Sequence, residues 1–535
     1  MKSVNCSWWV QRWAELYPYK AALIVDHVPI TYRELNIRTN RTASWLQDTG
    51  IEKGDRVAVL LDNCPEFIEL YLACARLGAI FVPLNFRLTA GELDYLIRNC
   101  RPRLFVFGES VRTAVDQLDL CAYRPPLQAA IVRDGIYPAM GQVPSHHSDK
   151  EAGTETNGAT FIFDYHRETA ECSGRQPALT PSLAPTDLNE AQVIMYTSGT
   201  TGWPKGAVLT HAKTFFNCLN ADIFFELSFH DIMLVVLPLF HSGGLFIQTS
   251  PCLYKGATLV LHRHFDPVAA YEDIERYQVT KFLGVPTVYR SLFKVEAEGR
   301  AELTSLRVCA IGGEKLTPET LVECWNNGFP VRQVMGQTET SILLWSSEQE
   351  VHDRPGSVGR PVFHAEVDVW NDQGMPVATD EVGEIVVRGS VLMKEYWQEP
   401  AQTEWVLRGG WLHTGDLARR DRDGYYYLVD RAKDMYISGG ENVYPAEVER
   451  VLAQHPAVHE VAIIGVADDT WGEVGHAFII STDGHNAPCP EELAAWTRRH
   501  LAGYKVPRHF TFCDDFPRTA LGKVRKFMLK QMLQE

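Results

Sequence analysis

The sequence predicts an α/β protein with a large N-terminal domain and a smaller C-terminal domain. Its 535 residues exceed what one hydrophobic core normally supports. Strand-like apolar runs alternate with helices in the N-terminal part, which is typical of βαβ units around a parallel sheet. Downstream, a β-rich stretch at 358–429 precedes a compact unit that mixes helices with one long strand.

Capping signals define the first helices. Thr31 and Glu34 form a capping box, because the hydroxyl and the carboxylate can each satisfy a free backbone N–H, and they predict a helix that Gly50 ends. Thr89 and Glu92 form a second capping box. Around them we expect a strand at 57–61, a helix at 65–77, a strand at 80–82 and a strand at 104–107.

The middle of the chain has weaker signals. Residues 141–187 are rich in Ser, Thr, Gly, Pro and His, and apart from an apolar island at 159–163 we expect surface loops there. The stretch at 358–429 contains Gly383-Glu384 and Asp423-Gly424, so we expect a small twisted sheet with tight turns.

A domain boundary is predicted near Lys433, which divides the chain into residues 1–432 and 433–535. The second part carries a predicted helix near 446–454, a strand at 458–466 and a helix at 490–501. No fixed-period repeat is visible, so solenoid and propeller folds are excluded.

Charge and cysteine content exclude several classes of protein. With 51 basic and 67 acidic residues the net charge is -16, so nucleic acid is not an expected partner, although a local polyphosphate site is compatible with it. The 12 cysteines are scattered without a zinc or redox motif. We expect reduced thiols and a cytoplasmic location.

No segment of the sequence predicts membrane insertion. The N-terminus lacks the continuous apolar stretch of a secretory signal. The most apolar run, 232–247, is too short to cross a bilayer and contains Pro238 and His241. We expect a buried strand there, followed by a functional turn.

A loop at 197–206 carries the clearest chemistry. It reads Thr-Ser-Gly-Thr-Thr-Gly-Trp-Pro-Lys-Gly and follows an apolar strand at 193–196. Glycines allow close backbone approach, hydroxyls and amides donate to phosphate oxygens, and Lys205 adds a full charge. Pro204 directly before Lys205 excludes a Walker A loop. The expected phosphate-binding residues are Thr197, Ser198, Gly199, Thr200, Thr201, Gly202 and Lys205.

Four further residues are candidates on chemical grounds. Glu339 beside Thr338 is a hard-oxygen site suited to Mg²⁺. Asp416, in a Thr-Gly-Asp turn, can accept both hydroxyls of a ribose. His241 follows an apolar strand, and Lys523 lies in a Gly-Lys turn of a basic stretch; taken alone, both residue types are more often structural or solvated.

Six motifs in order resemble the adenylate-forming superfamily of acyl-CoA synthetases, nonribosomal peptide adenylation domains and luciferases. Besides the loop they are Met335–Glu339, Thr414–Asp416, Asp430–Lys433, Ser438–Asn442 and Pro517–Lys523. The resemblance spans nearly the whole chain. It implies doubly wound sheets and a small β-barrel-like subdomain in the N-terminal domain, and a small, mobile α+β C-terminal domain.

The resemblance also implies residue roles at the nucleotide. Arg431 joins Asp416 at the ribose, and Lys523 enters the site for adenylation only, where it acts beside Lys205. Glu339 and Thr201 are the implied metal-binding residues. The implied adenine and phosphate contacts are Gly312, Gly313, Glu314, Met335, Gly336, Gln337 and Thr338.

Roles around the acid and the thiol follow from the same resemblance. His241 contacts the carboxylate and gates the acyl pocket, and Lys433 is the hinge. The implied pocket walls are Ser242, Gly243, Gly244, Phe215, Gly284, Val285, Val334 and Ser341. The implied coenzyme A (CoA) residues are Ser438, Gly439, Gly440, Glu441 and Trp471.

The implied reaction has two steps. A carboxylate attacks the α-phosphorus of ATP and expels pyrophosphate, and a thiol then attacks the acyl-adenylate. A lysine placed for the first step would obstruct the thiol, so the small domain must move between the steps. ATP, Mg²⁺, CoA and a small carboxylic acid are the expected partners, and a homodimer is open.

Several alternatives stay open. An amino-acid adenylation domain is disfavoured, because no acidic anchor for an ammonium group lies near His241. The chain stops soon after Lys523, so CoA is expected as acceptor ahead of a carrier protein. A luciferase shares the motifs, and a non-catalytic acyl or nucleotide binder would keep the fold. Medium- to long-chain fatty acids and aryl or polycyclic acids are equally compatible.

Overall fold

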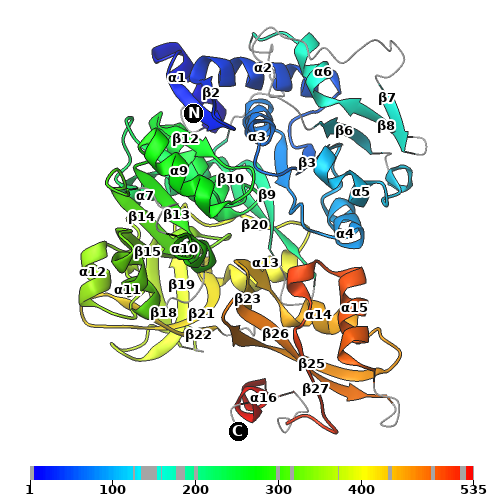
Figure 1. Ribbon diagram of the computed structural model, residues 1–535, viewed down its shortest axis with the longest axis vertical. Coiled ribbons are helices and arrows are strands. Elements are labelled where there is room, and N and C mark those ends of the chain that lie inside the picture. The colour runs from blue at the N-terminus through cyan, green and yellow to red at the C-terminus, as the bar shows by residue number, and fades with distance from the viewer. Residues whose placement is uncertain are drawn as a thin grey trace.

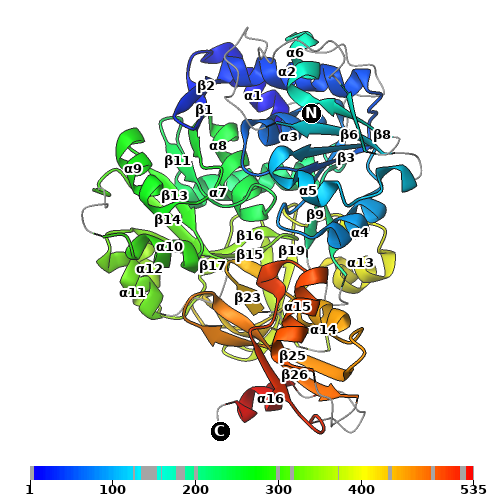
Figure 2. The ribbon, with the colours of Figure 1, turned by 45° about the vertical axis from the view of Figure 1, so that its right-hand side comes forward.

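The computed structural model has two bodies, with the small domain beneath the large one in both views (Figures 1 and 2). It describes residues 5–123, 127–133, 154–157, 160–175, 187–197, 203–296, 302–313, 318–371, 373–431, 436–482, 488–517, 524 and 526–533. The large domain contains two nine-stranded sheets and a four-stranded sheet, and the small domain has a five-stranded sheet.

One nine-stranded sheet carries the strands on either side of the phosphate loop. Its order is β20-β10-β9-β4-β3-β5-β6-β8-β7. The parallel strands are β3 (Arg56–Leu60), β4 (Ile80–Pro83), β5 (Leu104–Gly108), β6 (Gln128–Val132), β8 (Thr160–Asp164) and β9 (Ala191–Thr197). The antiparallel strands are β10 (Lys205–Thr210), β20 (Glu395–Tyr396) and β7 (Thr154–Asn157). The loop joins β9 to β10, so two paired strands hold its ends.

The other nine-stranded sheet has the order β17-β16-β15-β14-β13-β11-β12-β1-β2. Its parallel strands are β1 (Ala21–Val25), β12 (Thr258–Leu261), β11 (Ile232–Val235), β13 (Lys281–Gly284), β14 (Val308–Gly312) and β15 (Val331–Gln337). The antiparallel edge strands are β2 (Val28–Thr31), β16 (Ser341–Ser346) and β17 (Arg360–Pro361). Ligands bind beyond the carboxyl ends of such parallel strands.

Helices cover both sheets and pack between them. They are α1 (Cys6–Leu16), α2 (Tyr32–Asp48), α3 (Pro65–Leu77), α4 (Ala90–Cys100), α5 (Arg112–Val115), α6 (Tyr165–Glu171), α7 (His211–Phe225), α8 (Ser250–Lys255), α9 (Pro267–Tyr277), α10 (Pro286–Phe293), α11 (Pro318–Asn326), α12 (Glu348–Asp353) and α13 (Pro400–Val406). Every residue of α3 is buried, including Glu66, Glu69 and Arg76, which places this helix inside the large domain.

The remaining strands form two smaller sheets. The four-stranded antiparallel sheet consists of β18 (Glu366–Trp370), β19 (Val382–Arg388), β21 (Leu412–Arg420) and β22 (Tyr426–Arg431). The small domain contains β23 (Tyr436–Ser438), β24 (Glu441–Val443), β25 (Val458–Asp468), β26 (Gly472–Ser481) and β27 (His509–Phe512), with α14 (Pro445–Leu452), α15 (Pro490–His500) and α16 (Lys526–Met532). The expected fold class is confirmed.

Both predicted capping boxes are present. Thr31 accepts from the Glu34 backbone N–H at the start of α2, and Thr89 accepts from that of Glu92 at the start of α4. Gly50 has φ +81°, a left-handed conformation just after the end of α2. The predicted helices and strands between residues 57 and 107 are confirmed to within a residue or two at their ends.

The expectation of surface loops at 141–187 is wrong at 154–157, which form β7, and at 165–171, which form α6. Residues 141–153 and 176–186 lie outside the described residues. The apolar island lies within β8, which pairs in parallel with β6 and extends the sheet. Helix α6 follows directly, and the Tyr165 hydroxyl donates to Glu69 at 2.8 Å in the interior. Burial of this short segment against the sheet and α2 provides what its local composition does not signal.

The expected turn after β11 is a π-helix at Gly243–Thr249. Single π-turns are rare and occur frequently at functional sites. The π-helix begins directly after His241 and Ser242, which follow β11 in the chain.

No helix in the described part of the chain is long and apolar enough to cross a membrane. The 12 cysteines are all free thiols, and eight of them are buried.

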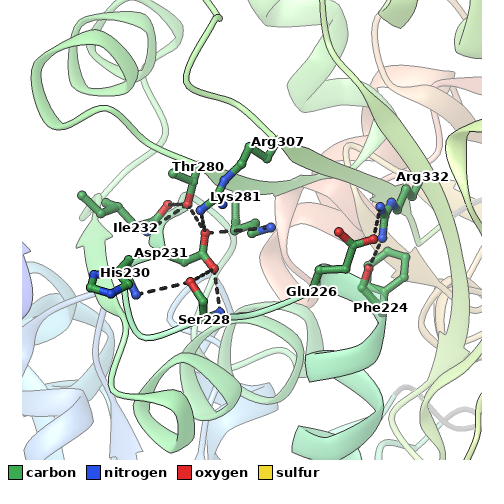
Figure 3. A network of polar contacts seen from close by, with 10 residues as sticks. All are labelled: Phe224, Glu226, Ser228, His230, Asp231, Ile232, Thr280, Lys281, Arg307 and Arg332. Carbon is green, nitrogen blue, oxygen red and sulfur yellow. Dashed lines mark hydrogen bonds and ion pairs between the residues drawn. The ribbon is translucent and has the colours of Figure 1, made fainter.

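The buried carboxylate of Asp231 links residues at the amino ends of the parallel strands β11, β13 and β14 (Figure 3). Asp231 precedes β11, and its side chain is fully buried. It accepts from the Ser228 backbone N–H at 2.7 Å and from the Thr280 hydroxyl at 2.7 Å. Arg307 pairs with it directly, and the Lys281 Nζ lies 3.9 Å away. The two cations come from the starts of β14 and β13.

We predict that Asp231→Ala lowers the free energy of unfolding of the large domain by about 3–5 kcal/mol, because it leaves the buried Lys281 ammonium without its counter-ion. Urea denaturation followed by tryptophan fluorescence measures this. Glu366→Ala, which breaks an exposed pair with Arg388, is the matched control and should shift the midpoint little. Equal midpoints for the two variants would contradict the prediction.

Candidate active site

A cavity of about 570 Å³ lies between the two domains. The large domain contributes the loops at the carboxyl ends of β11, β13, β14 and β15, with parts of β10, β20 and β21. The small domain contributes residues 439–442, 444 and 469–471. The cavity is thus completed only when the two domains meet.

Lys205 and Thr197, two of the predicted phosphate-binding residues, line the cavity. The Lys205 Nζ donates to Gln402 Oε1 at 2.8 Å and lies 5.6 Å from the centre of the Tyr396 ring. The side chain is held between α13 and β20, facing the end of the phosphate loop. The predicted contacts Ser198, Gly199, Thr200, Thr201 and Gly202 lie outside the described residues.

Gln337 joins two of the predicted nucleotide motifs. Its Nε2 donates to Asp416 Oδ2 at 2.7 Å and to the Thr414 carbonyl at 3.0 Å. Asp416 is 4% exposed and lines the cavity. Arg431 is the register partner of Asp416 on the next strand, although its side chain lies outside the described residues. The hydrogen bonds therefore orient the carboxylate predicted to bind ribose.

Glycines at the ends of β14 and β15 allow close packing of the backbone beside the nucleotide motifs. A side chain at Gly312 would meet the Val334 carbonyl at 2.2 Å, and one at Gly336 would meet the Ser341 carbonyl at 1.7 Å. Both glycines line the cavity with Gly313 and Thr338. Met335 packs against the core and is not a lining residue, and Glu314 lies outside the described residues.

Glu339, the predicted metal-binding residue, lies at the cavity wall. It is 9% exposed and lines the cavity. The Tyr396 hydroxyl donates to its Oε1 at 2.7 Å. Burial, and then the Glu339 charge, raise the pKa of Tyr396 far above its ordinary value, so the tyrosine stays a donor. The Tyr396 hydroxyl thus orients one carboxylate oxygen, and the other has no side-chain donor among the described residues.

The described residues include no cluster of three or more His, Cys, Asp or Glu side chains that could hold a metal ion. A lone buried carboxylate fits Mg²⁺ in the way that nucleotide enzymes use it, with most ligands coming from phosphates and water.

His241 meets a carboxylate from the other domain. Its Nε2 lies 2.7 Å from Glu441 Oε2, and Arg87 pairs with the second oxygen of the same carboxylate. Glu441 is 5% exposed at its side chain. Burial alone would raise the pKa of Glu441, but His241, Arg87 and Lys505 outweigh it and hold the pKa below its ordinary value. The carboxylate is therefore charged at neutral pH, and the contact is lost only as the pH falls through that lowered pKa.

Further contacts hold the small domain in this orientation. Lys505 of the small domain is buried and donates to Glu92 of α4 at 2.7 Å and to Glu447 of α14 at 2.9 Å. The Arg450 guanidinium lies 3.4 Å from the centre of the ring of Trp203, a residue of the phosphate loop. Because the charges on both domains are buried and paired, another orientation of the small domain would leave them unpaired.

Most predicted acyl-pocket residues lie together. Ser242, Gly243, Gly284, Val285, Val334 and Ser341 line the cavity, with Val236, Leu237 and Ile247. Gly244 packs under the Pro238 carbonyl, which a side chain would meet at 2.4 Å. Phe215 is not among the lining residues; its ring packs against Trp9 and Tyr254.

The predicted CoA residues frame the opening on the small domain. Gly439, Gly440 and Trp471 line the cavity, while Ser438 is buried in β23. The Gly439 backbone N–H donates to the Trp471 carbonyl at 2.8 Å. The predicted hinge Lys433 and catalytic Lys523 lie outside the described residues. Helix α16, which follows Lys523, lies at the far end of the small domain from the large one (Figures 1 and 2).

Comparison with known proteins identifies the family. Residues 10–397 match the model of the AMP-binding enzyme, and residues 447–523 match the AMP-binding enzyme C-terminal domain. The chain belongs to the AMP-binding enzyme family. Feruloyl-CoA synthase of an Amycolatopsis species is 38% identical over 98% of both chains. With relatives of this kind over its full length, the chain is an ATP-dependent acid–CoA ligase of this family.

Solved structures of one relative differ in how well they match. The o-succinylbenzoate CoA synthetase of Bacillus subtilis, as a double mutant bound with a CoA product analogue, superposes with a TM-score of 0.83, 31% identity and 98% coverage of both chains. The same enzyme in complex with its acyl-adenylate intermediate gives a TM-score of 0.68, 31% identity and coverage of 98% and 97%. The chain as a whole therefore superposes better on the product-analogue complex.

Sequence reasoning missed several residues that hold the site. Arg87, Tyr396 and Gln402 support Glu441, Glu339 and Lys205 respectively. The Arg508 guanidinium lies 5.3 Å from the Trp471 ring at the small-domain opening. None belongs to the recognised motifs, and each acts on a residue distant in the sequence, so no local signal could have found them.

We predict that Lys205→Ala slows acyl-adenylate formation about 10²- to 10³-fold, because one positive group facing the phosphates is lost. ATP–pyrophosphate exchange at saturating acid measures this. Lys255→Ala removes a lysine that pairs with Asp222 outside the cavity and should leave exchange unchanged. A loss of less than tenfold for Lys205→Ala would contradict the assignment.

Proposed function

We propose that this CoA ligase activates aryl carboxylic acids and that the structure has the domain orientation of the thioester-forming step. The observation that carries the proposal is the Glu441 contact, which brings the loop at 439–441 of the small domain to His241 at the acyl end of the cavity. The two relatives described above support aromatic acids, since one acts on a feruloyl group and the other on o-succinylbenzoate.

In the first step a carboxylate oxygen of the acid attacks the α-phosphorus of ATP, and pyrophosphate leaves. We assign Lys205 and Lys523 to the crowded negative charge, and Asp416 and Arg431 to the ribose. Glu339, oriented by Tyr396, is proposed to hold Mg²⁺ with Thr201. When bound, the cation supplies neutralisation of phosphate charge.

In the second step the CoA thiol attacks the acyl carbon of the mixed anhydride, and AMP leaves. Gly439 and Gly440 have φ of +59° and +80° and bring bare backbone to the cavity. Backbone without side chains at these two positions supports a narrow channel through which the CoA thiol could reach the acyl-adenylate. Trp471 and Arg508 offer an aromatic face and a positive charge at its opening, which suits the nucleotide of CoA.

The two steps require different positions of the small domain. Glu441 and the described residues around Lys523 lie on different sides of that domain, since α16 is remote from the large domain (Figure 1). We propose that rotation about Lys433, between domains 1–432 and 433–535, exchanges them at the cavity.

The free cysteines support a reducing, cytoplasmic location. A homodimer is a separate proposal. Sedimentation of the purified protein tests it by giving the mass of the protein in solution.

We predict that two variants separate the half-reactions. Lys523→Ala should lower ATP–pyrophosphate exchange about 10²- to 10³-fold and leave thioester formation from supplied acyl-adenylate and CoA largely intact. Glu441→Ala should do the opposite, because it removes the carboxylate that docks the loop and leaves exchange to the other orientation. Rapid-quench measurement of each half-reaction checks both.

Loss of the same half-reaction in both variants would contradict the division of roles. Absence of exchange with every aryl and aliphatic acid in a panel would contradict the enzyme itself and favour a non-catalytic binder. Exchange without release of acyl-CoA would point to a carrier protein or another nucleophile as the acceptor.

A further inference from the structure

Lys213 is a fully buried lysine of α7 that the reaction above does not use. Its exposed fraction is 0%. Buried lysines are rare unless a carboxylate neutralises them. Lys505 of the same chain follows that rule, with Glu92 and Glu447 within 2.9 Å of its ammonium.

No carboxylate lies within ion-pair distance of Lys213 among the residues that the structure describes. Its Nζ donates to the Ser341 hydroxyl at 2.5 Å and lies 5.5 Å from the centre of the Phe246 ring. Burial lowers the pKa of Lys213 to about 7, against the raising effect of the more distant Glu339. Two of the three ammonium hydrogens have no side-chain acceptor in the described part of the molecule.

Ser341 connects the buried Lys213 ammonium to the cavity. An ammonium group only donates, so the Ser341 oxygen accepts and its own O–H is left to donate. The described residues offer no acceptor for it, whereas Ser341 lines the cavity directly. Its backbone has φ +58°, which is uncommon for serine and keeps the residue at the turn between β15 and β16.

The cavity that Ser341 lines also has apolar walls, among them Val334, Ile247 and Leu237. Ser242, a second lining residue, also has a buried hydroxyl without a hydrogen-bond partner among the described residues. A purely hydrocarbon acyl group would cover these donors and leave them unpaired, which is costly in a water-poor site.

We propose that Lys213 and Ser341 form a selectivity pair for acids whose acyl group carries a hydrogen-bond-accepting oxygen. The inference rests on the proposed function and deepens it, because it separates oxygenated acyl groups from plain alkyl or aryl ones. A hydroxyl, alkoxy, keto or second carboxylate group on the acid would each provide the acceptor. Lys213 acts through Ser341 and is a positioning residue, whereas Ser341 contacts the substrate.

The test compares matched acids in steady-state CoA ligation. The probes are 3-phenylpropenoic acid and its 4-hydroxy, 4-methoxy and 4-carboxy derivatives, with octanoic and 8-hydroxyoctanoic acids as an aliphatic pair. For the wild-type enzyme we expect kcat/KM to favour at least one oxygenated acid over its parent about 10- to 100-fold, the size of one hydrogen bond to a charge-assisted partner.

The variants are Ser341→Ala and Lys213→Met, which keep the backbone and the length of the lysine stem. Each should reduce that preference to within about threefold of unity, mainly through KM for the oxygenated acid, with a smaller change in kcat/KM for the parent acid. The double variant should lose no more than either single variant, because the two residues act as one unit. Lys281→Met, at a buried lysine that neighbours Asp231, is the matched control and should keep the preference.

Equal use of parent and oxygenated acids by the wild type would overturn the inference, as would an equal loss for both acids in Ser341→Ala. Ser341→Ala removes one oxygen and decides the matter even if Lys213→Met is too unstable to purify. These results differ from failure of the proposed function, in which no acid supports ATP–pyrophosphate exchange. The 4-methoxy and 4-carboxy acids then show whether a neutral or an anionic oxygen is preferred.

Discussion

The pairing of Glu441 with His241 and Arg87 is the contact on which the closed site depends. It places the charged and almost fully buried Glu441 carboxylate of the small domain against the His241 imidazole and the Arg87 guanidinium of the large domain. A buried charge tolerates little displacement, because removing one partner leaves the other uncompensated. The contact therefore specifies one orientation of the domains, and the cavity exists in this form because of it.

The sheet architecture explains why the chemistry gathers where it does. In the sheet that contains β11, β13 and β14, the carboxyl ends of the strands face the cavity, while the amino ends converge on Asp231 (Figure 3). The same strands thus carry a rigid charged network at one end and glycine-rich loops at the other. Stability and function are separated along the strands, which is a common property of α/β sheets.

Two buried lysines show how context decides what a residue can do. Lys505 has two carboxylates and stabilises a domain contact, whereas Lys213 has a serine hydroxyl and lies behind the acyl wall. The first is satisfied within the protein. The Lys213 ammonium has N–H groups without a side-chain acceptor among the described residues. It is hydrogen-bonded to Ser341, which lines the cavity, and through this serine it can favour acids with an oxygen acceptor.

The sequence by itself determined the features that depend on near neighbours. The capping boxes at Thr31 and Thr89, the strand before the phosphate loop and the order of the family motifs all rest on residues a few positions apart. The tertiary structure decided which side chains meet across the fold. His241 and Glu441 are 200 positions apart and Lys213 and Ser341 are 128 apart, so no local pattern records their contact. The π-helix after Ser242 and the burial of β8 and α6 were missed for the same physical reason: packing against distant elements outweighed weak local preference.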